Sequence, residues 1–210
     1  MYTPAHFKNE NQEELREFIR QNGFGILVSQ VEKKLWATHI PLVLTDDNKL
    51  LGHISLGNKQ SKALPNGEEV MVIFNGPHTY ISSSWYDHEN VPTWNYIAVH
   101  VYGKVRTIEG EELMESLRQL TDKYEKNSAK PVSVETMSKK YLDSQIRGIL
   151  GIEITIDRME ASYKLSQNRD EKNHTHIISE LEKREDENSV AIANAMRKYG
   201  YKNKEKRPIK

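Results

Sequence analysis

The segment from Gly76 to Tyr96 concentrates aromatic and small polar side chains, and it is the part of the chain best suited to hold a ligand. Its aromatic residues are Tyr80, Trp85, Tyr86, Trp94 and Tyr96, and its small polar residues include Ser82, Ser83, Ser84, Thr93 and Asn95. Aromatic faces stack on flat molecules at low entropic cost, and hydroxyl or amide groups orient heteroatoms by hydrogen bonds. The pattern therefore indicates a site for a flat, polar ligand, although the same aromatic residues could simply fill a small core.

A strand that runs into a helix start, from Gly52 to Lys62, is a second candidate. Asn58, Ser61 and Lys62 lie beside the backbone amides that the first turn of a helix leaves free. Such amides, the helix dipole and a lysine can together bind a phosphate. Taken alone, the segment is better explained as a solvated helix rich in lysine and glutamine.

Two shorter polar groups could also contribute to a site. Thr38 and His39 are neighbours on an expected strand, so their side chains point to opposite faces and only one can enter a given pocket. Lys164 and Gln167 lie in a polar run at the end of another strand, where their donors suit carbonyl and ring-nitrogen acceptors. An exposed turn explains this second run equally well.

The composition is that of an ordinary water-soluble chain. Its 210 residues carry 30 basic and 30 acidic side chains, and 37% of them are hydrophobic, enough for one sizeable core. The absence of cysteine excludes disulfides, thiolate zinc sites and a cysteine nucleophile, and it fits a reducing cytoplasm. No apolar run approaches the roughly 20 residues of a membrane span, so we expect a cytoplasmic protein that does not enter the membrane.

Several common functional motifs are missing from the sequence. There is no glycine-rich dinucleotide loop, no Walker lysine loop and no nucleophile elbow. His174 and His176 are two residues apart, a spacing that does not place both on one helical face, so we expect no metal site.

Hydrophobic periodicity predicts an α+β fold made mainly of antiparallel strands. Strands are predicted at 24–30, 34–44, 50–56, 69–76, 93–109 and 151–165, the first three as a meander. Helical patterns follow Asn11, Leu113 and Met137, with a short helical stretch at 58–64. The strand from Tyr96 to Val105 is apolar or aromatic on both faces, which suits a small barrel that also packs against helices or a second subunit. We expect a barrel domain with packing helices at 1–168 and a helical C-terminal extension at 169–210.

The order of several short motifs resembles the PaiB family, which is grouped with the FMN-binding split barrels and described as negative regulators of protease synthesis and sporulation. The motifs are MYTPAHF, ATHIPL, GHISLGN, GPHTYISSSWY, VPTWNY, AVHVYGKV, GIEI and KLSQN, and they extend over nearly the whole chain. The resemblance implies a split β-barrel homodimer with an FMN site at the subunit interface, flanked by helices and followed by a helical tail.

The resemblance also implies roles for individual residues. Ser61 and Lys62 would hold the flavin phosphate, with Thr38 or His39 on the phosphate or ribityl side and His53 and Asn58 adjoining. Trp85, Trp94 and Asn95 would lie near the isoalloxazine ring or across the dimer seam. Lys164 and Gln167 would reach the polar edge of the ring.

Three functions remain compatible with such a barrel. The resemblance favours a flavin-binding regulator that acts through its cofactor or a partner. A flavin-dependent oxidoreductase of the pyridoxamine-phosphate-oxidase type is the enzyme alternative, in which the cofactor would carry the redox chemistry. Histidines and aromatic walls also suit haem, so a haem-binding module is a third possibility.

We expect no direct sequence-specific binding to DNA. The chain has zero net charge and lacks a compact helix-turn-helix with a polar recognition face. The basic tail from Lys198 to Lys210 is the main counter-indication, because it could contact phosphates weakly and in a salt-dependent way.

Overall fold

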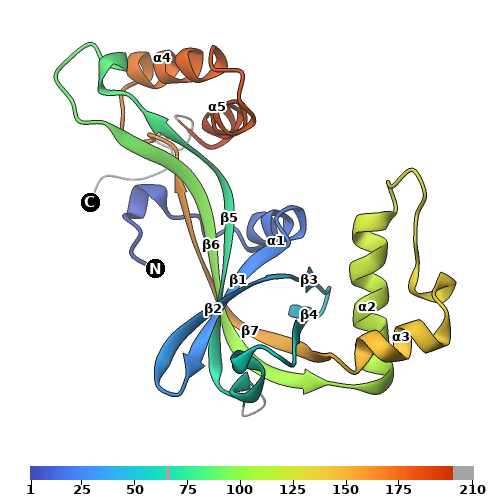
Figure 1. Ribbon diagram of the computed structural model, residues 1–210. Helices are drawn as coiled ribbons and strands as arrows, with labels where there is room; N and C mark the ends of the chain where they lie inside the picture. The colour runs from blue at the N-terminus through green and yellow to red at the C-terminus, as the bar shows by residue number, and fades with distance from the viewer. Residues whose placement is uncertain (65–66, 201–210) are drawn as a thin grey trace. The chain divides into compact units, whose positions relative to one another are not determined.

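The computed structural model describes residues 1–64 and 67–200, which divide into two compact units (Figure 1). The barrel unit comprises residues 12–74 and 100–159. The helical unit comprises residues 1–11, 75–99 and 160–200. The expected boundary between residues 168 and 169 stays a prediction.

One seven-stranded sheet has the strand order β2-β1-β5-β6-β7-β4-β3. Its strands are β1 (Phe24–Val31), β2 (Lys34–Pro41), β3 (Val43–Leu44), β4 (Lys49–Ser55), β5 (Glu69–Ile81), β6 (Thr93–Ile108) and β7 (Ile149–Lys164). The registered pairs β1–β2, β1–β5, β3–β4 and β4–β7 are all antiparallel. Within the barrel unit β2 also contacts β4, so the sheet curls back toward itself.

The predicted strand at 34–44 is divided in two at Leu42, which corrects the expected meander. The Leu42 amide donates to the carbonyl oxygen of Gly23 over 2.8 Å instead of joining a strand ladder, and its side chain is fully buried. The first half, β2, pairs with β1, whereas the second half, β3, pairs with β4. The two hairpins therefore lie at opposite ends of the strand order.

Helices precede, separate and follow the strands along the described chain. They are η1 (Ala5–Phe7), α1 (Gln12–Gln21), η2 (Lys59–Lys62), η4 (Ser83–Trp85), α2 (Gly110–Glu125), η5 (Val134–Thr136), α3 (Lys139–Ile146), α4 (Glu171–Glu182) and α5 (Glu187–Tyr199). In α1 the predicted apolar face is the buried one, through Leu15, Phe18 and Ile19. In α3, by contrast, no residue is buried, so the predicted apolar periodicity there does not serve a core.

In the helical unit, α4 and α5 pack against each other (Figure 1). Each begins with an aspartate cap, because Asp170 accepts from the Asn173 amide and Asp186 accepts from the Ser189 amide. Their shared core is apolar and fully or almost fully buried, with Ile177, Ile178, Leu181, Ile192, Ala193 and Met196. The predicted C-terminal helices are confirmed.

A buried carboxylate joins the elements of the barrel unit. Glu153 on β7 has a side chain only 9% exposed, and Arg106 on β6 binds both of its oxygens at 2.7 and 2.9 Å. The same guanidinium binds both oxygens of Glu112 on α2 at 2.8 and 3.0 Å. Lys49 on β4 lies 3.5 Å from Glu153. Because a buried charge needs close partners, this cluster fixes α2 to the strands it covers.

We predict that Arg106→Met lowers the free energy of unfolding by about 1–3 kcal/mol, because it removes the bidentate partner of a buried carboxylate. Chemical denaturation measures the change. Arg118→Met is the matched control, since Arg118 also binds several carboxylates, but those of Glu111, Glu115 and Glu135 are exposed. Equal losses in the two variants would contradict a special role for Glu153.

Candidate functional site

The residues predicted for a phosphate site lie in the barrel unit, and several are joined through Gln60. This glutamine of η2 is fully buried. The Thr38 hydroxyl donates to Gln60 Oε1 over 2.6 Å and accepts from Asn58 Nδ2 over 2.8 Å. Gln60 Nε2 donates to the Ser29 hydroxyl over 2.8 Å, and the backbone N–H of Gln60 donates to Asn58 Oδ1 over 3.0 Å. Thr38 and Asn58 are thus brought together, and their hydrogen bonds hold η2 against β1 and β2.

Ser61 and Lys62 differ in what they leave available to a ligand. Ser61 is buried, and its hydroxyl donates to the Leu56 carbonyl oxygen over 3.3 Å. Lys62 is exposed and forms no ion pair or hydrogen bond with the described residues. Of this group, Lys62 offers the unsatisfied positive charge.

The two predicted histidines of the barrel unit lie apart from the Gln60 cluster. His39 is exposed on the face of β2 opposite Thr38, as the strand alternation predicts, and its ring stacks 6.0 Å from that of Phe24. His53 is half-buried on β4, and burial lowers its pKa. Its Nδ1 is buried and finds no hydrogen-bond partner among the residues described.

Trp94 and Asn95 lie in the helical unit on opposite faces of β6. The Trp94 side chain is 53% exposed and has His78 and Tyr80 near it, at ring-centroid distances of 6.2 and 6.0 Å. Asn95 is fully buried, and its amide exchanges hydrogen bonds with the Ser166 hydroxyl at 3.0 and 3.1 Å. Trp94 can offer an aromatic surface, whereas Asn95 fixes the strand end internally.

Lys164 and Gln167 occupy the end of β7 and the turn after it. Lys164 Nζ donates to the Thr93 hydroxyl over 2.5 Å and pairs with no carboxylate in the described chain. Burial, followed by repulsion from Arg169, lowers the pKa of Lys164. The side chain of Gln167 accepts from the Leu165 amide over 2.8 Å and donates to the Tyr163 carbonyl oxygen, so it holds the turn.

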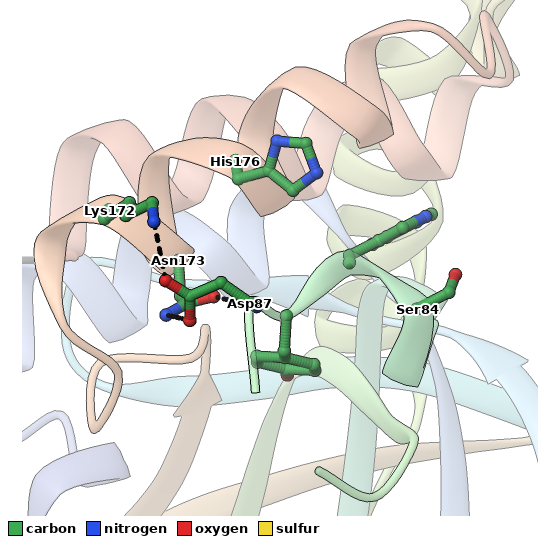
Figure 2. A pocket seen from close by; sticks show the side chains of 7 residues that line it. Ser84, Asp87, Lys172, Asn173 and His176 are labelled. Carbon is green, nitrogen blue, oxygen red and sulfur yellow. Dashed lines mark hydrogen bonds and ion pairs between the residues drawn. The ribbon is translucent and has the colours of Figure 1, made fainter. Parts of the chain in front are cut away.

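Trp85 lines a hollow of about 210 Å³ in the helical unit, between η4 and α4 (Figure 2). The other lining residues are Ser84, Tyr86, Asp87, Lys172, Asn173 and His176. Asp87 accepts from Lys172 Nζ over 2.7 Å, from Asn173 Nδ2 over 2.8 Å and from His88 Nδ1 over 2.9 Å. These donors, Lys172 first, hold the pKa of Asp87 far below its usual range.

The predicted site residues thus form separate groups. Thr38, Asn58 and Ser61 lie near Lys62 on or beside η2. Trp94 and Lys164 belong to the helical unit, as does Trp85 in its own hollow. Sequence reasoning missed the central role of Gln60 and the α4 residues of the hollow. Gln60 lies within the segment predicted to bind phosphate. Glutamine side chains are mostly exposed in proteins, so the residue type alone does not indicate that this one is fully buried.

Two absences hold for residues 1–64 and 67–200. No cluster of three or more histidine, aspartate or glutamate side chains is arranged to hold a metal ion. None of the helices has the length and apolar character needed to cross a membrane.

Residues 1–158 match the family model described as "Putative FMN-binding domain". The chain is 44% identical over 199 residues to "Protease synthase and sporulation protein PAI 2" of Bacillus subtilis, covering 93% of this chain and 96% of that protein. It is 31% identical over 231 residues to an uncharacterized protein of Emericella nidulans, covering 89% and 92% of the two chains.

Two solved structures resemble the fold. The FAD and heme binding protein from Mycobacterium smegmatis has a TM-score of 0.62 at 16% identity, covering 80% of this chain and 78% of that one. The flavocytochrome Anf3 from Azotobacter vinelandii has a TM-score of 0.59 at 15% identity, covering 80% and 75%. At these identities the likeness is one of fold, and the predicted α+β split barrel is confirmed.

We predict that Gln60→Ala lowers the free energy of unfolding by about 1–3 kcal/mol, because it removes the Gln60 partner of the buried Ser29 hydroxyl and the acceptor of the Thr38 hydroxyl. Lys59→Ala, at the exposed neighbouring position, should change it by less than about 0.5 kcal/mol. Urea denaturation of both variants measures the difference. If Gln60→Ala proves as stable as Lys59→Ala, the buried amide does not hold η2.

Proposed function

Because this chain belongs to the PaiB family and carries its FMN-binding domain, we propose that it is an FMN-binding regulator that restrains protease synthesis and sporulation. The observation that supports this role most directly is the near full-length relation to a Bacillus protein whose name refers to both processes. The proposal places the protein in the cytoplasm, in keeping with a chain that has no cysteine.

The phosphate of FMN is assigned to the η2 region of the barrel unit. Lys62 supports this assignment because it is exposed and unpaired within the described chain. The neighbouring hydroxyl and amide groups of Thr38, Asn58 and Ser61 already have partners inside the protein. They therefore position the segment, while the lysine supplies charge. An ammonium group of this kind fits a phosphate dianion chemically.

Lys164 of the helical unit is assigned to the polar edge of a flavin ring. Its ammonium group is partly buried and lacks a carboxylate partner among the described residues, so it can stabilise negative charge on a ligand. When bound, FMN supplies the capacity to accept and donate electrons, and nearby protein charge tunes that capacity. Occupancy or redox state of the flavin would then alter the contacts of the regulator.

We assign the outer face of β2, β1 and β5 to a homodimer contact. Alternate residues of these paired strands place Phe24, Ile26, Val28 and Leu35 on one side, joined by Met71 and Ile73. Phe24 is 62% exposed and Leu35 is 80% exposed. Contiguous apolar surface of this kind marks an interaction site, and β2 also presents a sheet edge.

We propose that regulation acts through the flavin or through a protein partner. Sequence-specific contact with DNA is not part of this proposed function. The zero net charge of the chain supports it, because sequence-specific binders usually present a strong basic surface. Of the basic tail, residues 201–210 lie outside the described part of the chain.

We predict that Lys62→Ala weakens FMN binding by about 10-fold or more, the equivalent of a charged hydrogen bond worth roughly 1.5–3 kcal/mol. Lys59→Ala, which removes an exposed lysine three residues away, should leave the affinity nearly unchanged. Quenching of flavin fluorescence measures both dissociation constants. Equal affinities in the two variants would move the phosphate site elsewhere.

We also predict that light scattering gives twice the mass of one chain and that Leu35→Glu shifts the protein toward the monomer, because the new charge would be buried in the contact. Tyr141→Glu is the control, since Tyr141 is also exposed, at 55%, but lies on α3. A wild-type protein that stays monomeric at micromolar concentration would contradict the dimer.

A further inference from the structure

The hollow between η4 and α4 is distinct from the FMN assignment above. Three of its seven lining residues come from α4, which begins at Glu171 and so lies beyond the residues matched by the FMN-binding family. Its volume is about 210 Å³. Sites for drug-sized ligands measure about 300–1,000 Å³, so this hollow suits a molecule of a single ring and is too small for a whole flavin.

Trp85 forms a fixed aromatic wall of the hollow. The guanidinium of Arg184 lies 4.5 Å from the centre of its ring and covers one face. Arg184 is itself held, because its Nη1 donates to the Tyr80 carbonyl oxygen over 2.8 Å and to the Thr79 hydroxyl over 3.1 Å. A ring held in this way can stack on a planar ligand without losing further conformational freedom.

Asp87 and Asn173 of the lining are held by hydrogen bonds. Three donors bind the Asp87 carboxylate, and the side-chain Oδ1 of Asn173 accepts from the backbone N–H of Asp87 over 3.1 Å. These acceptors are therefore occupied, whereas the buried hydroxyl of Tyr86, also in the lining, has no hydrogen-bond partner among the described residues.

Two hydrogen-bond donors of the lining, the side chains of Lys172 and His176, keep N–H groups available for a ligand. Lys172 uses one of its three N–H groups on Asp87. His176 Nε2 lies 3.9 Å from Glu180, beyond hydrogen-bond distance. Figure 2 shows both side chains projecting from α4 toward the segment that carries Ser84 and Asp87. The hollow thus offers the remaining N–H donors of Lys172 and a ring N–H of His176 to an incoming group that accepts hydrogen bonds, while the Lys172 charge is shared with Asp87.

We propose that this hollow binds a small planar carboxylate, a one-ring aromatic or heteroaromatic acid. The ring lies against Trp85, and the carboxylate accepts hydrogen bonds from Lys172 and His176. Such a ligand matches the size of the hollow, its aromatic wall and its surplus of donors. Because Lys172 and His176 lie on α4 and Trp85 lies on η4, the ligand would contact both elements.

Benzoate is the probe that tests this proposal, with the full-length protein and ligand-observed NMR. We expect saturable binding that Trp85→Leu weakens by about tenfold or more, because the stacking surface is lost. Trp94→Leu is the matched control, since it removes an exposed tryptophan of the same unit but not of the hollow, and it should change the affinity less than about twofold.

Two further ligands separate ring from charge on the wild-type protein, so the test does not depend on a variant that folds. Benzamide keeps the planar ring without the charge, and cyclohexanecarboxylate keeps the charge without the flat ring. Both should bind about tenfold more weakly than benzoate. Benzamide binding as tightly as benzoate would overturn the anion assignment, and absence of saturable benzoate binding would overturn the site.

An FMN titration in the presence of saturating benzoate distinguishes this site from the flavin site. Unchanged FMN affinity, alongside benzoate binding that depends on Trp85, is the expected result. Direct competition between the two ligands would overturn the assignment of the hollow as a separate site.

Discussion

Gln60, Glu153 and Asn95 lie inside the protein, where a polar side chain without a partner would cost about 1–3 kcal/mol or more. Each is satisfied by groups from other elements. Gln60 joins η2 to the β1–β2 hairpin, and Glu153 joins β7 to β6 and α2 through Arg106. Asn95 joins β6 to the turn after β7 through Ser166. The requirement that buried polar groups be paired therefore fixes how the elements within each unit meet.

The pairing of buried polar groups also distinguishes residues that stabilise the fold from residues whose side chains can bind a ligand. Thr38, Asn58 and Ser61 make their hydrogen bonds within the protein, so they hold η2 in place, whereas Lys62 is exposed beside Ser61, as is Lys59 at the start of η2. Lys164 has a hydroxyl partner but no carboxylate within the described residues. The phosphate of the proposed flavin would supply the negative charge that Lys62 lacks within the protein.

Much of this fold could be predicted from hydrophobic periodicity. The apolar spacing of Leu15, Phe18 and Ile19 identified the buried face of α1 because it reports directly on burial. Pairing between distant strands leaves no such local mark, so the division of a predicted strand at Leu42 was missed. Residue type also predicted where polar side chains gather near η2, but it could not tell Gln60, which is buried, from Lys62, which is exposed.

Equilibrium titration of FMN into the purified wild-type protein, followed by absorption and flavin fluorescence, tests the central claim most directly. We expect saturation at one FMN per chain, with the perturbed absorption of a bound flavin. Absence of saturable FMN binding would contradict it, and so would a protein that carries haem, with its Soret band, and excludes the flavin.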